Sequence, residues 1–168
     1  MVGVKWVKLD GESIYVFNSA IYIFESSSSC SLELGLIVSE VALKKYKDME
    51  SLIVEIELED GRILSQFMYL RTLPGRLPQL NLFCDLDDTE DYEGFHRVSE
   101  NDSVFPNIEE GITLEDIRKV EMPNEKATLK LTLPIDQVEW LKNQKTRDLN
   151  AIFKELIYEY MNKQGEDV

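Results

Sequence analysis

The stretch Leu52-Ile-Val-Glu-Ile-Glu-Leu-Glu-Asp-Gly-Arg-Ile-Leu-Ser-Gln-Phe-Met-Tyr-Leu70 holds the strongest local pairing pattern in the chain. From 52 to 58, apolar residues alternate with Glu55 and Glu57, which is the period of two expected of a half-buried strand. Asp60-Gly61 has the composition of a tight hairpin turn. The stretch therefore predicts a β-hairpin whose first strand has an acidic outer face and whose second strand covers 63–70.

Strand patterns outnumber helix patterns along the rest of the first 122 residues. Three short runs rich in Val, Ile, Tyr and Phe cover 4–9, 13–17 and 20–25, and the pairs Asp10-Gly11 and Asn18-Ser19 separate them with turn-forming residues. We expect these three runs to form an antiparallel meander. A further apolar run at 80–84 predicts another strand.

Two helices and a long loop complete the predicted body. Residues 39–49 predict a helix with Ser39 as its N-cap, and Thr113 with Asp116 has the form of a capping box at the start of a second, short helix. Residues 85–110 are polar, so we expect a long surface loop there. Pro123-Asn124 then marks the expected end of an acidic, β-rich body of residues 1–122.

Charge is distributed unevenly along the 168 residues, whose net charge is -14. Residues 1–125 hold 11 Lys or Arg against 25 Asp or Glu, whereas residues 126–163 hold 7 against 5. An acidic body repels nucleic acid, so any contact with DNA is expected from the C-terminal part. No apolar run approaches the ~18 residues of a membrane span, and the first residues lack the apolar core of a secretory signal. We therefore expect a cytoplasmic protein that does not enter a membrane, with Cys30 and Cys84 as free thiols.

Residues 126–163 carry the most specific pattern in the sequence. Between 127 and 133, three leucines alternate with Thr128, Lys130 and Thr132, which predicts a strand with one apolar face. Pro134 closes this strand and opens a helix over 135–143. A second, amphipathic helix is expected from about 150 to 163, with Asn150 or Asp148 as its cap. Residues 164–168 are expected to form a disordered end.

This order of a strand, a short helix, a turn and a longer amphipathic helix resembles the ribbon-helix-helix family over about a quarter of the chain. In that family two chains pair their strands into an antiparallel ribbon that enters the major groove of DNA. The resemblance implies that Thr128, Lys130 and Thr132 read base edges and that the start of the second helix, near Asn150, holds a phosphate. It also implies a dimer core of six apolar residues: Leu129, Leu131, Leu133, Ile152, Phe153 and Leu156.

An acidic segment of the body admits two further interpretations. Leu80-Asn-Leu-Phe-Cys-Asp-Leu-Asp-Asp-Thr89 resembles the first motif of the haloacid dehalogenase-like phosphohydrolases, which implies a nucleophilic Asp85 and a general acid or base at Asp87 beside Mg²⁺. The carboxylates from Asp85 to Glu93 could also bind a cation without catalysis. However, no alternating strand-helix series follows Thr89, and His96 is the only histidine. We favour a solvated acidic loop and assign no catalytic, cofactor-binding or metal-binding residue.

These patterns predict an α+β protein, with a mostly antiparallel β body, a few short helices and a C-terminal strand-helix-helix. The sequence leaves open whether this tail is an independent module or packs into the core of the body. We expect a non-catalytic interaction or regulatory protein that self-associates, or binds another protein, through the tail. The alternatives are a DNA-binding regulator of the ribbon-helix-helix type, an acidic inhibitor that mimics nucleic acid, and a Mg²⁺-dependent phosphohydrolase.

Overall fold

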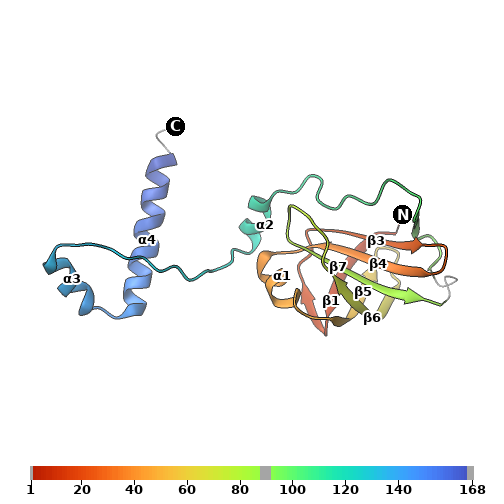
Figure 1. Cartoon of the computed structure of the whole chain (residues 1–168), viewed down its shortest axis with the longest axis horizontal. Helices are drawn as coiled ribbons and strands as arrows, with labels where there is room; N and C mark the ends of the chain where they lie inside the picture. The colour runs from red at the N-terminus through yellow and green to blue at the C-terminus, as the bar shows by residue number, and fades with distance from the viewer. Residues whose placement is uncertain (1, 88–91, 166–168) are drawn as a thin grey trace. The chain divides into compact units, whose positions relative to one another are not determined.

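The computed structural model of the chain describes residues 2–87 and 92–165. The chain divides into two compact units, Met1–Asn124 and Glu125–Val168, and Figure 1 draws both. The first unit contains every strand of the described residues, and the second contains only helices and irregular chain. The α+β class that the sequence predicts is confirmed.

The first unit is built on one eight-stranded sheet. Its strands in chain order are β1 (Val4–Leu9), β2 (Glu12–Ile14), β3 (Asn18–Glu25), β4 (Cys30–Ile37), β5 (Ser51–Leu58), β6 (Ile63–Arg71), β7 (Gln79–Leu86) and β8 (His96–Ser99). They lie in the order β2-β1-β5-β6-β7-β4-β3-β8, and only β3 and β8 run parallel. Figure 1 shows the strands wrapped around a common interior.

The main core lies on one side of this sheet, because alternate side chains of a strand point to opposite faces. In β5, Val54, Ile56 and Leu58 are fully buried, as the alternation predicts. Buried residues from β1, β3, β4, β6 and β7 join them. Ile37, at the end of β4, instead packs with Ile108 and Ile117 in a second, smaller cluster. The segment after β8 therefore covers part of the outer side of the sheet.

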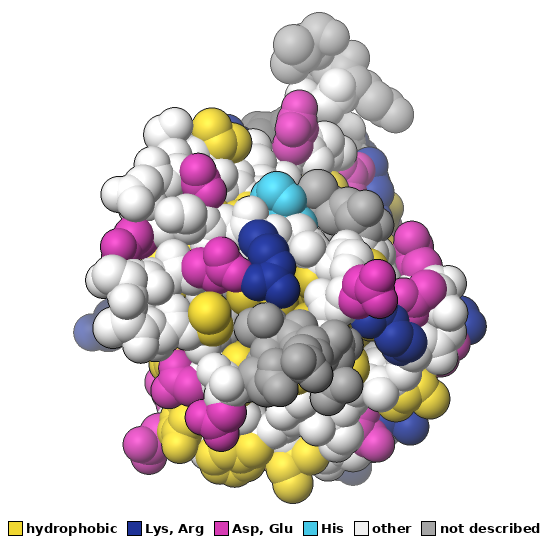
Figure 2. Space-filling model, turned by 90° about the vertical axis from the view of Figure 1, so that its right-hand side faces the viewer, with side chains coloured by type: hydrophobic (Ala, Val, Ile, Leu, Met, Phe, Trp, Pro, Cys, Tyr) yellow, Lys and Arg dark blue, Asp and Glu magenta, His cyan; other side chains and the backbone are white. Residues whose placement is uncertain are grey.

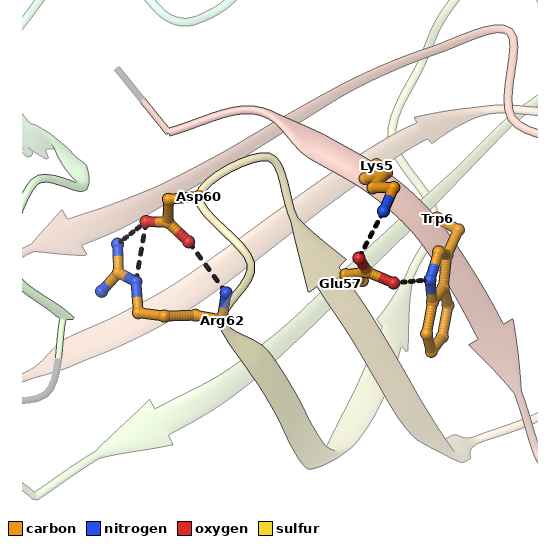
Figure 3. Close-up of polar contacts among 5 residues, drawn as sticks. All are labelled: Lys5, Trp6, Glu57, Asp60 and Arg62. Carbon is orange, nitrogen blue, oxygen red and sulfur yellow. Dashed lines mark hydrogen bonds and ion pairs between the residues drawn. The ribbon is translucent and has the colours of Figure 1, made fainter.

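The predicted hairpin at Asp60-Gly61 joins β5 to β6 and is confirmed. Its glycine has a φ of 90°, a conformation that side chains rarely adopt. The Asp60 carboxylate accepts hydrogen bonds from the backbone N–H and the guanidinium of Arg62 (Figure 3). Across the neighbouring strand pair, Glu57 accepts hydrogen bonds from Lys5 and Trp6 of β1. These contacts reinforce both the turn and the register of β1 on β5.

Both predicted helix caps in the body are confirmed. In α1 (Glu40–Tyr46), the Ser39 side chain accepts a hydrogen bond from the N–H of Ala42 at 3.0 Å. In α2 (Leu114–Val120), the hydroxyl oxygen of Thr113 accepts from the N–H of Asp116, and the Asp116 carboxylate accepts from the N–H of Thr113. The aspartate therefore performs the role that glutamate or glutamine usually has in a capping box.

The predicted meander of the first three strands is wrong. β1 and β2 pair across the turn at Asp10-Gly11, but β3 pairs with β4 along its whole length. The serine run 26–29 makes this second turn, in which Ser26 donates its N–H to the carbonyl of Ser29 at 2.9 Å. β4 was not among the predicted strands, although its leucines at 32, 34 and 36 repeat with the period of two. β3 pairs with β4 on one edge and with β8 on the other, so neither edge is left for β2.

The surface loop predicted over 85–110 is wrong for the described part of that range, 85–87 and 92–110. β8 lies within them and pairs with β3. Tyr92 and Phe95 are buried in the main core, with ring centroids 5.4 Å apart, and the Tyr92 hydroxyl accepts a hydrogen bond from Gln66 at 2.8 Å. Two buried aromatic side chains therefore anchor a segment whose composition is otherwise polar.

Candidate self-association surface

The C-terminal unit contains the helices α3 (Ile135–Lys142) and α4 (Thr146–Gly165), joined by residues 143–145. Pro134 occupies the N-cap position of α3, in agreement with the predicted helix over 135–143. α4 begins at Thr146, earlier than predicted. Its last residues belong to the end predicted to be disordered, so that prediction is wrong for 164 and 165, and 166–168 lie outside the described residues.

The strand predicted between 127 and 133 does not form in the single chain. No described residue of this unit belongs to a strand, and Thr128, Lys130 and Thr132 are exposed. The physical reason is that a strand needs a hydrogen-bonding neighbour, and none of the described strands pairs with this segment. The predicted strand-helix-helix is therefore an extended segment followed by two helices.

The extended segment and the two helices enclose an apolar groove of about 580 Å³. Eight apolar and two polar residues line it: Leu131, Leu133, Asp136, Gln137, Trp140, Leu141, Leu149, Ile152, Phe153 and Leu156. Five of the six residues that the family resemblance implies for a dimer core are among them. The sixth, Leu129, does not line the groove and is 74% exposed.

Neither helix of this unit contains a buried residue. Phe153 is 39% exposed, Trp140 is 52% exposed and Leu131 is 57% exposed. Chains of about 40 residues rarely bury enough surface to fold alone, and they usually rely on disulfides, metals or oligomerisation. The groove is therefore an apolar surface that needs a cover if this unit is to be stable.

Three apolar groove residues were absent from the predicted dimer core: Trp140, Leu141 and Leu149. A signal for them exists in the sequence. Leu149 precedes Ile152, Phe153 and Leu156 by three, four and seven residues, the spacing of one helix face. Trp140 and Leu141 follow Gln137, another groove residue, by three and four residues, so these three positions share one face of α3.

Asn150 does not mark the start of the second helix, so the predicted cap there is wrong. It is the fifth residue of α4, whereas the free backbone N–H groups of a helix belong to its first four residues. In the first turn of α4, the N–H groups of Asp148 and Leu149 already donate to the carbonyl of Lys145, and Asp148 adds a negative charge there. Asn150 remains exposed on the helix surface.

The acidic segment of the body has a different setting from the one that the phosphohydrolase resemblance implies. Asp85 and Asp87 are exposed at the end of β7, in a mostly antiparallel sheet rather than an alternating parallel α/β core. Residues 88–91, which include the last two residues of that motif, lie outside the described residues. Among the described side chains, no group of three or more His, Cys, Asp or Glu is placed to hold a metal ion. His96, at the start of β8, is exposed.

The negative charge of the body is interrupted by cations on the face drawn in Figure 2. There, Asp and Glu side chains are interspersed with Lys, Arg and apolar ones. Several arginines pair with carboxylates, as Arg118 does with Glu40, and this hydrogen-bonded pair holds the pKa of the Glu40 carboxyl below its usual value. This face does not present the continuous negative surface expected of a nucleic-acid mimic.

The two cysteines, Cys30 and Cys84, are free thiols. Burial first, and then the negative charges of Asp85 and Glu33, raise the pKa of Cys84 to about 11, so it is protonated and unreactive at neutral pH.

Within 2–87 and 92–165, no helix has the length and apolar character needed to cross a membrane. Comparisons with protein-family models, with curated proteins and with solved structures give no match for this chain.

Proposed function

We propose that this chain is a non-catalytic cytoplasmic protein that self-associates through its C-terminal unit. The observation that supports the proposal is the apolar groove between 131–133, α3 and α4, in a unit whose helices bury no residue. In the proposed dimer, residues 127–133 of two copies pair as antiparallel strands. The groove residues of each copy then cover those of the other.

A twofold interface suits this surface, because both copies offer the same unpaired extended segment and the same uncovered apolar face. Each copy can therefore supply the neighbour and the cover that the other needs. Pairing through the backbone gives residues 127–133 the neighbour that the single chain does not supply. The side chains of Thr128, Lys130 and Thr132 then share the outer face of the ribbon, and the leucines face the groove.

The charge distribution also favours association through this part of the chain. Residues 126–163 hold 7 cationic against 5 acidic side chains, whereas residues 1–125 hold 11 against 25. Two bodies repel one another, but salt screens charges that lie more than ~8 Å apart at physiological ionic strength. The nearly neutral tail is therefore the region where two copies meet at the lowest electrostatic cost.

The test is the mass of the full chain in solution, measured by light scattering at several concentrations. The wild type is expected to have twice the 19.5 kDa mass of one chain. Ile152→Asp places a charge in the groove and should give a single-chain mass. Tyr158→Asp is the matched control, because Tyr158 is 68% exposed on α4 and does not line the groove. A monomeric wild type, or equal effects of the two substitutions, would contradict the proposal.

DNA binding is the second candidate function, favoured by the exposure of Thr128, Lys130 and Thr132 on a tail with an excess of cationic side chains. In a paired ribbon these three side chains would point away from the groove and towards a nucleic acid. An electrophoretic shift at low salt tests it, since phosphate contacts weaken as salt rises. Lys130→Glu should reduce the shift, and the absence of any shift with the wild type would remove this candidate.

A further inference from the structure

A second pocket lies in the first unit, on the side of the sheet opposite the main core. It has a volume of about 340 Å³, and β3, β4, β6, β7 and the segment 104–108 contribute its lining. Two contacts hold that segment against the sheet. Phe105 stacks on Phe24 with ring centroids 6.2 Å apart, and Asn18 donates a hydrogen bond to the carbonyl of Ile108 at 2.9 Å. The pocket is thus a formed feature of the body.

Opposite charges lie side by side in this pocket. The side chain of Glu33 on β4 is only 11% exposed, and one of its oxygens accepts a hydrogen bond from Ser31 at 2.7 Å. The Nη1 of Arg71 lies 3.5 Å from the other oxygen, which is longer than the ~2.7–2.9 Å of a charge-assisted hydrogen bond. The Arg71 guanidinium rests on the ring of Phe83, 4.2 Å from its centroid. Both charged groups therefore keep hydrogen-bonding capacity for a ligand.

Two neutral donors accompany this pair. The Nδ2 of Asn81 is buried and has no hydrogen-bond partner among the described residues, whereas buried amides nearly always have one. Asn81 lies opposite Arg71 on one side and Gly35 on the other, so its side chain belongs to the floor of the pocket. Tyr22 lies opposite Glu33, and burial together with the Glu33 charge raises the pKa of its hydroxyl, which stays a donor.

Apart from Gln79, the remainder of the lining is formed by apolar residues and Gly35. Its larger apolar side chains are those of Phe24, Leu73, Phe105, Pro106 and Ile108. Binding sites for small molecules commonly combine apolar walls with a few convergent polar groups, and 340 Å³ falls at the lower end of their usual range of roughly 300–1,000 Å³. The fitting ligand is therefore small, with one apolar part and two opposite charges a few ångströms apart.

We propose that this pocket binds a free α-amino acid with an apolar side chain. Its carboxylate fits Arg71 and the Nδ2 of Asn81, its ammonium group fits the Glu33 carboxylate, and its side chain fits the wall made by Phe24, Phe105 and Ile108. A free amino acid carries both charged groups on the same α-carbon, whereas a chain terminus of a peptide carries only one of them. This site belongs to the first unit, so the inference does not depend on self-association through the tail.

Titration calorimetry of the full chain with L-phenylalanine and with L-leucine tests the proposal. Arg71→Gln and Glu33→Gln should each weaken binding roughly tenfold or more, because each removes a charged hydrogen-bond partner. Arg97→Gln is the matched control. Arg97 is 44% exposed, as Arg71 is 45% exposed, and it pairs with Glu25 without lining the pocket. Equal weakening by the control would overturn the assignment.

Two derivatives separate a free amino acid from a peptide terminus. N-acetyl-L-phenylalanine lacks the ammonium group and L-phenylalaninamide lacks the carboxylate, so both should bind roughly tenfold or more weakly than L-phenylalanine. Equal or tighter binding of either derivative would overturn the proposal. The wild type supplies a readout that does not depend on the folding of a variant: the side-chain amide NMR signal of Asn81 should shift on titration. No binding of either amino acid, and no shift of that signal, up to about 10 mM would also overturn it.

Discussion

Replacing Phe153 by alanine should weaken self-association about a thousandfold if the groove of the C-terminal unit is the dimer core. Phe153 is 39% exposed in the single chain. A phenylalanine side chain has roughly 200 Å² to bury, so about 80 Å² per copy remains for the interface. At about 25 cal/mol per Å², this area contributes ~2 kcal/mol per copy and ~4 kcal/mol in a twofold dimer. A difference of this size corresponds to roughly 10³ in Kd.

Sedimentation velocity over a dilution series gives the two dissociation constants directly. The matched control is Tyr158→Ala, which truncates another exposed aromatic residue of α4 that does not line the groove. The control should change the dissociation constant less than about threefold, because surface substitutions usually stay within ~0.5 kcal/mol. A loss below tenfold for Phe153→Ala, or an equal loss for the control, would refute the assignment of the groove as the dimer core.

Three further predictions concern the body. Ser39→Ala should lower the free energy of unfolding by about 1 kcal/mol in urea titrations, because it removes the N-cap acceptor of α1 and the hydroxyl that donates to Glu121. An unchanged urea midpoint would contradict the stabilising role of the Ser39 cap. Cys84 should react with iodoacetamide more slowly than Cys30 at pH 8, because its pKa is raised to about 11. Peptide mass spectrometry measures the two rates, and equal rates would contradict the burial of the Cys84 thiol. Hydrogen bonds from the N–H groups of Leu77 and Arg76 lower the pKa of Glu109, so its stabilising effect is complete above the usual pKa of a glutamate and is lost as the pH falls through the lowered value. Unfolding titrations between pH 6 and pH 3 should therefore show a stability difference between wild type and Glu109→Gln that shrinks as the pH falls, and a constant difference would contradict this account.

Local patterns predicted much of the body because the interactions that form them are local. The hairpin at Asp60-Gly61 and the caps at Ser39 and Thr113 involve residues only a few positions apart. The partner of β3 could not be predicted in this way. The eight-residue β4 takes one edge of β3, and β8, which is distant in the sequence, takes the other, so the three-residue β2 is left beside β1 alone. Competition between distant strands decides such topology.

The prediction of a surface loop over 85–110 was wrong for a different reason. Its composition favours a loop, but the aromatic side chains of Tyr92 and Phe95 anchor it in the main core, and β8 pairs with β3. Average polarity over a long window conceals two such anchors. The strand predicted over 127–133 does not form because no described strand lies beside this segment to hydrogen-bond with it, so the single chain leaves it extended.

The candidate surfaces differ in how far they could be predicted from the sequence. Groove residues on α4 repeat with the helical period and the leucines of the extended segment repeat with the period of two, and five of the six predicted core residues line the groove. The pocket of the body gathers Tyr22, Glu33, Arg71 and Asn81 from four strands. No spacing in the sequence relates these positions, because the strand order β6-β7-β4-β3 alone brings them together.

In the proposed dimer, residues 127–133 pair with the same residues of a second copy. Isotope-filtered NMR on a mixture of labelled and unlabelled full-length chains measures this pairing directly. The account predicts contacts between backbone protons of this segment in different copies, in the antiparallel pattern, together with contacts from Phe153 to the partner copy. Contacts of this segment with the strands of its own body, and none between copies, would contradict it.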